Sequence, residues 1–171
     1  MFDFLSNNGP WDQLIKLQNI TLEKIQNELS IKLNSRISIT PILVPHRDEY
    51  SETVCYLVST MKKKLLYIPD IDKWHLWDKD IKEMIKIVDY ALLDGTFYQD
   101  GELSKDMSKI PHPFVKESMM LFKDLSKQNK QKVFFTHLNH TNPLIIKESK
   151  EQFEVKKLGF NFAMDNLVLE L

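Results

Sequence analysis

Residues 64–95 read KLLYIPDIDKWHLWDKDIKEMIKIVDYALLDG, and the changing spacing of their apolar residues indicates the fold class. Within residues 64–68, the four positions after Lys64 are successively apolar, as in a strand covered on both faces. From Asp78 to Val88 the apolar residues recur at intervals of three and four, which predicts a helix. A second apolar run at 90–93 predicts a short buried strand. Strand, helix and strand in this order are typical of α/β layers.

The same pattern continues on both sides of this stretch. A short helix is expected near Pro10, because proline fits the first turn of a helix. Gly159 closes a later helix, and the chain is expected to end in a hairpin that turns at Asp165 and Asn166. The remaining predicted elements are strands at 29–33, 37–40, 42–44, 54–58 and 132–136 and helices from Pro113 and over 149–158. No repeat or linker interrupts the pattern, so we expect a single domain over residues 1–171.

Composition excludes several classes of protein. The 171 residues are 43% apolar and 27% charged, and 23 Lys and Arg against 24 Asp and Glu give a net charge of −1. This balance provides no field that would attract nucleic acid or an anionic membrane. No apolar run approaches the roughly 20 residues that span a bilayer, and the N-terminus lacks the pattern of a secretory signal. We therefore expect a cytoplasmic protein whose single cysteine, Cys55, is a buried hydrophobe rather than a reactive thiol.

Histidine and aspartate residues follow the predicted strands or precede a helix. Neutral imidazole and carboxylate are ligands that zinc prefers, and catalytic sites collect them from separate strand ends. The residues concerned are His46, Asp70, Asp72, Asp94, His112, His137 and His140. No HExxH or CxxC spacing is present, so turn and capping roles remain open for each of them. His75 is expected to be a packing or surface residue.

Five ordered segments carry a resemblance to a known superfamily. They are VPHRDEYSETV at 44–54, YIPDIDKW at 67–74, LDGTFY at 93–98, IPHPF at 110–114 and THLNHTNP at 136–143. Together with NGPWDQL at 8–14, they resemble the metallo-β-lactamase fold superfamily, in the branch related to coenzyme PQQ synthesis protein B. The resemblance covers the whole chain and corresponds to the middle and C-terminal part of such proteins. It implies an αββα sandwich with a one- or two-metal site along one edge.

The resemblance also implies roles for individual residues. His46 matches the histidine that joins the first metal, Asp70 the aspartate that can bridge both metals, and His137 the histidine that joins the second. The implied cofactor is zinc or another divalent metal. Asp94, with Thr96, and His112 match the acid–base pair of ribonuclease Z relatives, in which the histidine donates a proton. The residues expected to support the ligands or contact the substrate are Asp72, His140 and Asn142, and a structural role is equally open for His140.

The sequence departs from the superfamily in one respect. The His-x-His-x-x-His segment, which the family carries upstream of the region that matches Met1 onward, does not occur in this sequence. We therefore expect an incomplete fold that lacks the N-terminal strands and one set of ligands. Each metal would then keep only two protein ligands, whereas catalytic zinc normally has three and a water.

These features together predict a metal-dependent hydrolase-type protein for a small-molecule substrate, inactive as this chain alone. The alternative is a non-catalytic relative that binds a small molecule or a partner chain. A ribonuclease Z-like nuclease is disfavoured by the neutral charge balance and by Leu93, which stands where that family has a histidine. Loss of one sheet of a sandwich would leave strands such as Leu65 to Ile68 partly uncovered, which predicts self-association through that sheet face.

Overall fold

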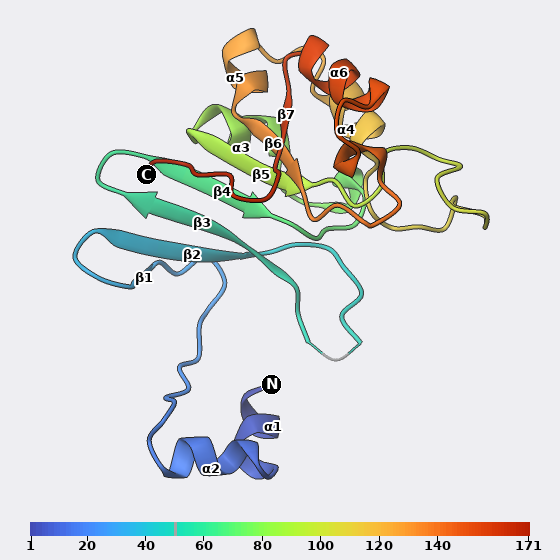
Figure 1. Cartoon of the computed structure of the whole chain (residues 1–171). Helices are drawn as coiled ribbons and strands as arrows, with labels where there is room; N and C mark the ends of the chain where they lie inside the picture. The colour runs from blue at the N-terminus through green and yellow to red at the C-terminus, as the bar shows by residue number, and fades with distance from the viewer. Residues whose placement is uncertain (50) are drawn as a thin grey trace.

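The computed structural model describes residues 1–49 and 51–171, so Tyr50 of the segment 44–54 lies outside it. The centre of the structure is a seven-stranded sheet in which each strand pairs with the next one in the chain (Figure 1). The strands are β1 (Ile31–Lys32), β2 (Ile37–Leu43), β3 (Val54–Thr60), β4 (Lys64–Ile68), β5 (Tyr90–Asp94), β6 (Val133–Thr136) and β7 (Asn161–Phe162). Strands β1 to β4 are antiparallel, and β4 to β7 are parallel.

Helices join the parallel strands and lie on one face of the sheet (Figure 1). The helices are α1 (Phe2–Asn7), α2 (Trp11–Lys16), α3 (Ile81–Lys86), α4 (Val115–Leu121), α5 (Lys127–Gln131) and α6 (Lys150–Lys157), with short 3₁₀ helices at Trp74–Leu76 and Pro143–Ile145. Because β4 to β7 follow one another in chain order, right-handed crossovers place α3 to α6 on the same face. The strand residues facing these helices are fully buried: Leu66, Ala91, Leu93, Val133 and Phe135.

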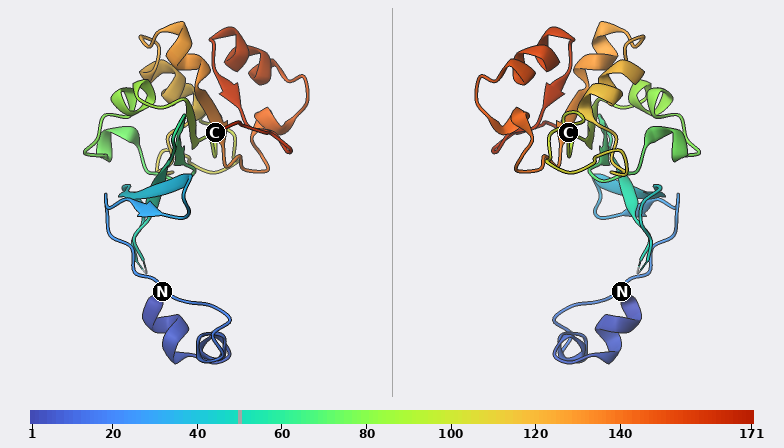
Figure 2. Two further views of the ribbon diagram at one scale, coloured as in Figure 1. Left: turned by 90° about the vertical axis from the view of Figure 1, so that its left-hand side faces the viewer. Right: turned by 90° about the vertical axis from the view of Figure 1, so that its right-hand side faces the viewer.

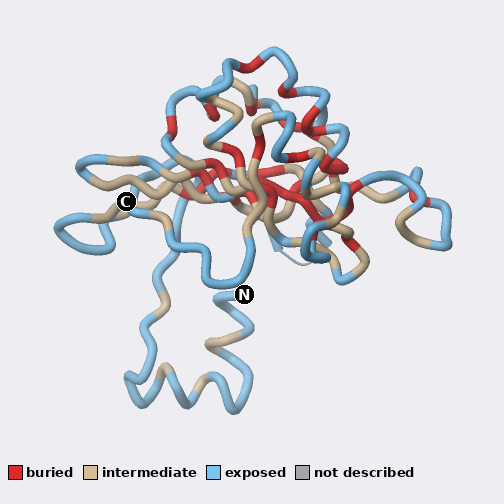
Figure 3. Tube along the Cα trace, turned by 45° about the horizontal axis from the view of Figure 1, so that its top comes forward, coloured by how far each residue is buried: buried red, intermediate tan, exposed pale blue. Residues whose placement is uncertain are grey.

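The opposite face of the sheet is apolar but only partly covered, and buried and half-buried residues alternate along the central strands (Figure 3). Leu65, Leu92 and Phe134 are half-buried there, and Tyr67 remains 38% exposed. Alternate residues of β4 therefore differ in burial, which corrects the expectation of a strand covered on both faces. The apolar sequence of β4 suits two covered faces, but the described part of the chain covers one.

Helices α1 and α2 lie apart from the sheet and are joined to it by an extended segment (Figure 2). Neither helix buries a residue. Phe4, Trp11 and Leu14 are exposed on them. No helix within residues 1–49 and 51–171 is long and apolar enough to cross a membrane.

Two sequence predictions about strands were wrong. Residues 37–40 and 42–44 do not form separate strands, since β2 runs through Pro41. Strand β1 pairs with β2 only at Ser38 and Ile39. At Pro41, β2 therefore has a partner strand, β3, on one side only, and the N–H that proline lacks removes no hydrogen bond between strands. The terminal hairpin is also absent among the described residues, because β7 pairs in parallel with β6 after the α6 crossover and no strand follows it.

Cys55 behaves as predicted. Its side chain is fully buried on β3. Burial raises the pKa of the thiol to about 12, so the nucleophilic thiolate is disfavoured at neutral pH.

Candidate metal centre

Five of the predicted site residues come together at one edge of the sheet. Asp70 follows β4, Asp94 ends β5 and His137 follows β6, and the carboxyl ends of parallel strands meet at the same edge. His46 joins them from the loop after β2, and His112 from the segment before α4. The imidazole of His112 lies between the other two, with ring centroids 5.9 Å from His46 and 6.4 Å from His137.

Asp70 is the carboxylate with free coordinating capacity. Its Oδ2 lies 3.5 Å from Nε2 of His46, and its Oδ1 lies 3.5 Å from Nδ1 of His112. Oδ1 is buried and accepts no hydrogen bond from any described residue, although the side chain as a whole is 33% exposed. A buried oxygen in this state costs about 1–3 kcal/mol unless a cation or donor satisfies it.

The separation of His46 and Asp70 fits a shared cation. Two ligands that each lie about 2.0–2.1 Å from a tetrahedral zinc are about 3.3 Å apart. The 3.5 Å between His46 Nε2 and Asp70 Oδ2 is close to that value. The donor types, one imidazole nitrogen and one carboxylate oxygen, also suit zinc and similar divalent metals.

Asp72 sets the orientation of His46. The Nδ1 atom of His46 lies 2.9 Å from Oδ1 of Asp72. Because an ionised carboxylate only accepts hydrogen bonds, Nδ1 carries a ring proton; in the neutral ring, Nε2 is then the nitrogen with the lone pair, on the side of Asp70. The backbone N–H of Asp72 donates to the carbonyl of Pro45 at 2.8 Å, so the two loops are joined beside the site.

Asp94 is fully buried and accepts four hydrogen bonds. Oδ1 accepts from the backbone N–H of Thr96 at 2.8 Å and from its hydroxyl at 2.7 Å, while Oδ2 accepts from Ile71 N–H at 3.1 Å and from His112 Nδ1 at 2.8 Å. Asp70, Asp94 and His112 each offer a ligand atom within 4.8 Å of the others. However, both oxygens of Asp94 are already engaged, so the geometry favours Asp94 as the residue that orients His112 rather than as a ligand.

His112 has a raised pKa. Burial lowers the pKa of its imidazole, but the hydrogen bond to Asp94 and the negative charges of Asp94, Asp70 and Asp72 raise it, and their effect is larger. The ring therefore keeps its second proton to a higher pH than an ordinary histidine. Phe97 packs edge-on against this ring at 6.1 Å between centroids and shields one side of it.

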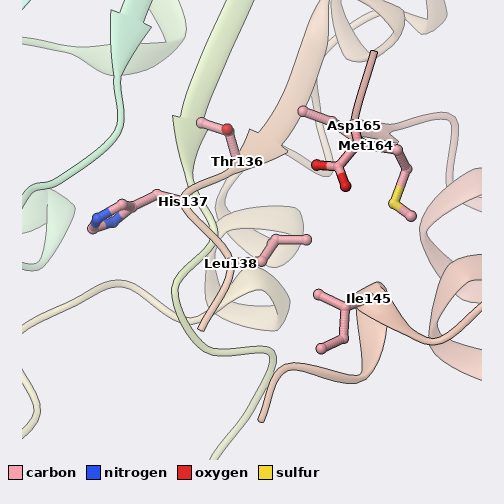
Figure 4. A pocket seen from close by; sticks show the side chains of 7 residues that line it. Thr136, His137, Leu138, Ile145, Met164 and Asp165 are labelled. Atoms are coloured by element: carbon pink, nitrogen blue, oxygen red, sulfur yellow. The ribbon is translucent and has the colours of Figure 1, made fainter. Parts of the chain in front are cut away.

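His137 stands at the end of β6 with a backbone φ of 59°, a left-handed conformation uncommon for a non-glycine residue. Its ring is exposed, and Nδ1 lies 3.1 Å from the hydroxyl of Thr96. Figure 4 shows the side chain pointing away from a pocket of about 370 Å³ beyond the strand, where Ile145, Met164 and Asp165 face one another. His137 is thus among the residues that line the pocket, but its imidazole points away from Ile145, Met164 and Asp165.

The two remaining supporting residues differ in their surroundings. Asn142 is fully buried, and its amide donates to the carbonyl of Gly95 at 2.6 Å. His140 is exposed and forms no hydrogen bond or ion pair with a residue at 1–49 or 51–171. The structure thus joins Asn142, but not His140, to the backbone of the site. His75, in the first 3₁₀ helix, is exposed.

The fold and this edge site define a class of protein. The chain belongs to the family described as the beta-lactamase superfamily domain, whose model matches residues 3–138. It is similar to coenzyme PQQ synthesis protein B of Methylorubrum extorquens, with 28% identity over 182 residues that cover 100% of this chain and 59% of the relative. The same protein of Acinetobacter baumannii is 26% identical over 144 residues, which cover 78% of this chain and 46% of the relative.

Solved structures show the same fold. Zinc-bound PqqB from Methylobacterium extorquens aligns with a TM-score of 0.78 and 23% identity, over 99% of this chain and 62% of that one. The metallo-β-lactamase fold protein YhfI from Bacillus subtilis aligns with a TM-score of 0.53 and 14% identity, over 87% and 56% of the two chains. These matches confirm the predicted superfamily branch and fold class. The chain spans about half the length of the curated relatives it matches.

Proposed function

We propose that this chain carries part of the centre of a metal-dependent hydrolase. His46, Asp70 and His137 are the proposed ligands of a divalent cation, and zinc is the favoured ion because it is bound in the similar PqqB structure. The observation that carries the proposal is the carboxylate of Asp70: its buried Oδ1 accepts no hydrogen bond from a described residue, and its Oδ2 lies 3.5 Å from Nε2 of His46. The nearly balanced charge of the chain favours a small-molecule substrate over a nucleic acid.

The side chains at this edge suit a hydrolytic proton transfer. A bound divalent cation lowers the pKa of a water and polarises a carbonyl or phosphoryl oxygen. Asp94 holds the Nδ1 proton of His112, so Nε2 is the nitrogen from which this ring can protonate a leaving oxygen. The raised pKa of His112 keeps the ring protonated to a higher pH than an ordinary histidine, and the buried Asp94 stabilises its positive charge.

The chain supplies few ligands for two ions. If Asp70 bridges them, His46 and Asp70 serve one ion and His137 and Asp70 the other, and catalytic zinc normally has three protein ligands. We therefore propose that the chain by itself binds zinc more weakly than a complete site and does not turn over substrate. A relative that binds a ligand without catalysis is the alternative.

Metal analysis tests the proposal directly. The purified chain is loaded with zinc, passed through a desalting column and measured by atomic emission, and affinity is determined by competition with a chromophoric chelator. Asp70→Asn retains the size of the side chain but removes the charge, and His46→Ala removes a nitrogen ligand. Both are expected to weaken zinc binding by at least tenfold, while His75→Ala, which changes an exposed histidine away from the cluster, is expected to bind like the wild type.

Two results would contradict the proposal. Zinc binding by Asp70→Asn at wild-type affinity would show that this carboxylate is not a ligand. A wild-type chain that retains no zinc under conditions in which its fold is intact would favour the non-catalytic relative.

A further inference from the structure

The hydroxyl of Thr96 has three polar neighbours within hydrogen-bonding distance. Its Oγ1 lies 2.7 Å from Asp94 Oδ1, 3.1 Å from His137 Nδ1 and 3.3 Å from His112 Nδ1. Thr96 is 9% exposed, so water has little access to this hydroxyl. The contacts connect one buried carboxylate to two histidines from different segments of the chain.

The direction of each of these hydrogen bonds follows from the number of protons available. A threonine hydroxyl has one proton and two lone pairs, and an ionised carboxylate can only accept. The proton of Thr96 must therefore point to Asp94 Oδ1, and the oxygen can only accept from the rings. His112 Nδ1 has a shorter bond to Asp94 Oδ2, at 2.8 Å, so the ring that depends on Thr96 is His137. With Nδ1 of His137 unprotonated, two lone pairs would face each other at 3.1 Å.

The backbone of Thr96 is held in place with respect to His137. The carbonyl of Thr96 accepts from Asn139 N–H at 3.0 Å and from the Asn142 amide at 3.3 Å. The N–H of Gly95 donates to the carbonyl of Thr136, at 2.9 Å. A Cβ at Gly95 would lie 2.9 Å from Cβ of Phe135, so the chain passes too close to β6 for a side chain there. The hydroxyl is thus presented to His137 by two loops that are bonded to each other.

We infer that Thr96 is a positioning residue, which relays the negative charge of Asp94 to His137 and fixes His137 as the Nδ1–H tautomer. Nε2 is then the only nitrogen of His137 with a lone pair for a metal. One buried carboxylate in this way orients two histidines, His112 directly and His137 through a hydroxyl. The inference rests on the proposed function for the role of His137 as a ligand, but the tautomer is a property of the metal-free chain.

The first measurement needs no metal, and it needs a variant only to assign the signals. Two-bond ¹⁵N–¹H correlation spectra of the metal-free chain, labelled at histidine, distinguish protonated from unprotonated ring nitrogens. At about pH 9, above the ordinary imidazole pKa of about 6.5, His137 is expected to appear as the Nδ1–H tautomer. The Nε2–H tautomer at His137 in the folded wild type would overturn the inference. His137→Gln assigns the signals.

The second measurement compares two substitutions. Thr96→Val keeps the shape of the side chain and removes the hydroxyl, and Thr96→Ser keeps the hydroxyl. Loss of an outer partner of a metal-bound histidine typically weakens metal affinity 10- to 100-fold. We expect a loss of this size for Thr96→Val, together with a shift of His137 toward Nε2–H, and zinc affinity within about threefold of the wild type for Thr96→Ser. Thr60→Val is the matched control. It also removes a threonine hydroxyl, which donates to the Lys63 carbonyl at the C-terminal end of β3.

The outcomes separate this inference from the proposed function. If the wild type binds zinc, and Thr96→Val changes neither the tautomer nor the affinity, the role of Thr96 is refuted and the metal site stands. If the wild type shows the Nδ1–H tautomer but binds no zinc, the relay stands and the proposed function fails. A Thr96→Ser variant that loses zinc affinity as strongly as Thr96→Val would also refute the relay, because the hydroxyl is present in it.

Discussion

Replacing Asp94 by asparagine tests the central hydrogen-bond arrangement of the site. The carboxylate is completely buried and accepts from four donors, two at each oxygen. Asparagine has nearly the same shape, but one acceptor oxygen becomes an NH₂ donor. Whichever way the amide turns, its NH₂ group faces two donors, either the N–H and hydroxyl of Thr96 or the N–H of Ile71 and Nδ1 of His112.

The expected loss of stability follows from the number of donors left without an acceptor. An unsatisfied buried donor costs roughly 1–3 kcal/mol, so two of them cost about 2–6 kcal/mol. His112 can move its proton to Nε2, and the Thr96 hydroxyl can rotate, so one of the two can be recovered. One unsatisfied donor remains, so we expect Asp94→Asn to lower the free energy of unfolding of the metal-free chain by about 1–3 kcal/mol, a substantial part of the 5–15 kcal/mol typical of domains.

Urea unfolding followed by tryptophan fluorescence, at low protein concentration, measures this change. Asp78→Asn is the control, because Asp78 is exposed and its substitution should change stability by less than about 0.5 kcal/mol. In the same variant the pKa of His112 should fall, since Asp94 is the main cause that raises it. A loss of less than about 0.5 kcal/mol, or an unchanged pKa of His112 by NMR titration, would refute the reasoning.

Three further predictions concern pH, packing and association. The pKa of His112 is raised in the folded chain, so its pairing with Asp94 stabilises the metal-free protein fully below about pH 6.5. This stabilisation decreases as the pH rises through the pKa of the folded state. His112→Gln should therefore flatten this part of the plot of stability against pH, measured by urea unfolding. Gly95→Ala should lower the melting temperature in calorimetry, because the added Cβ would lie 3.1 Å from the Thr136 carbonyl, and overpacking of this kind costs about 1–3 kcal/mol; an unchanged melting temperature would contradict it. The partly covered sheet face should cause self-association, seen as a sedimentation coefficient that rises with concentration and is reduced by Tyr67→Glu; a concentration-independent monomer would count against it.

Much of the fold follows from local periodicity. The change from successive apolar residues at 64–68 to a three-and-four spacing after Asp78 predicted β4, α3 and β5, and the structure has all three. The terminal hairpin was predicted on the same kind of local pattern and is absent from the described residues. Whether a short apolar run near the end of the chain pairs with itself or with β6 depends on the crossover made by α6, which no local spacing reveals.

The sequence by itself determined most of the residues that meet at the candidate site. Asp70 and His137 each follow a strand of the parallel part of the sheet and Asp94 ends one, and such strands end at a common edge. It also contained the ordered segments that mark the superfamily, which the family match over residues 3–138 confirms.

Only the tertiary structure decided what each of these residues faces. Asp72 bonds His46, Asp94 bonds His112, and Thr96 reaches His137, while Asp70 keeps an oxygen that no described residue bonds. Hydrogen bonds between loops depend on side-chain directions set by packing across the whole sheet, and the spacing of residues along the chain contains no information on them. For the same reason, His140 and Asn142 were equivalent candidates in the sequence, but the fold exposes the first and buries the second.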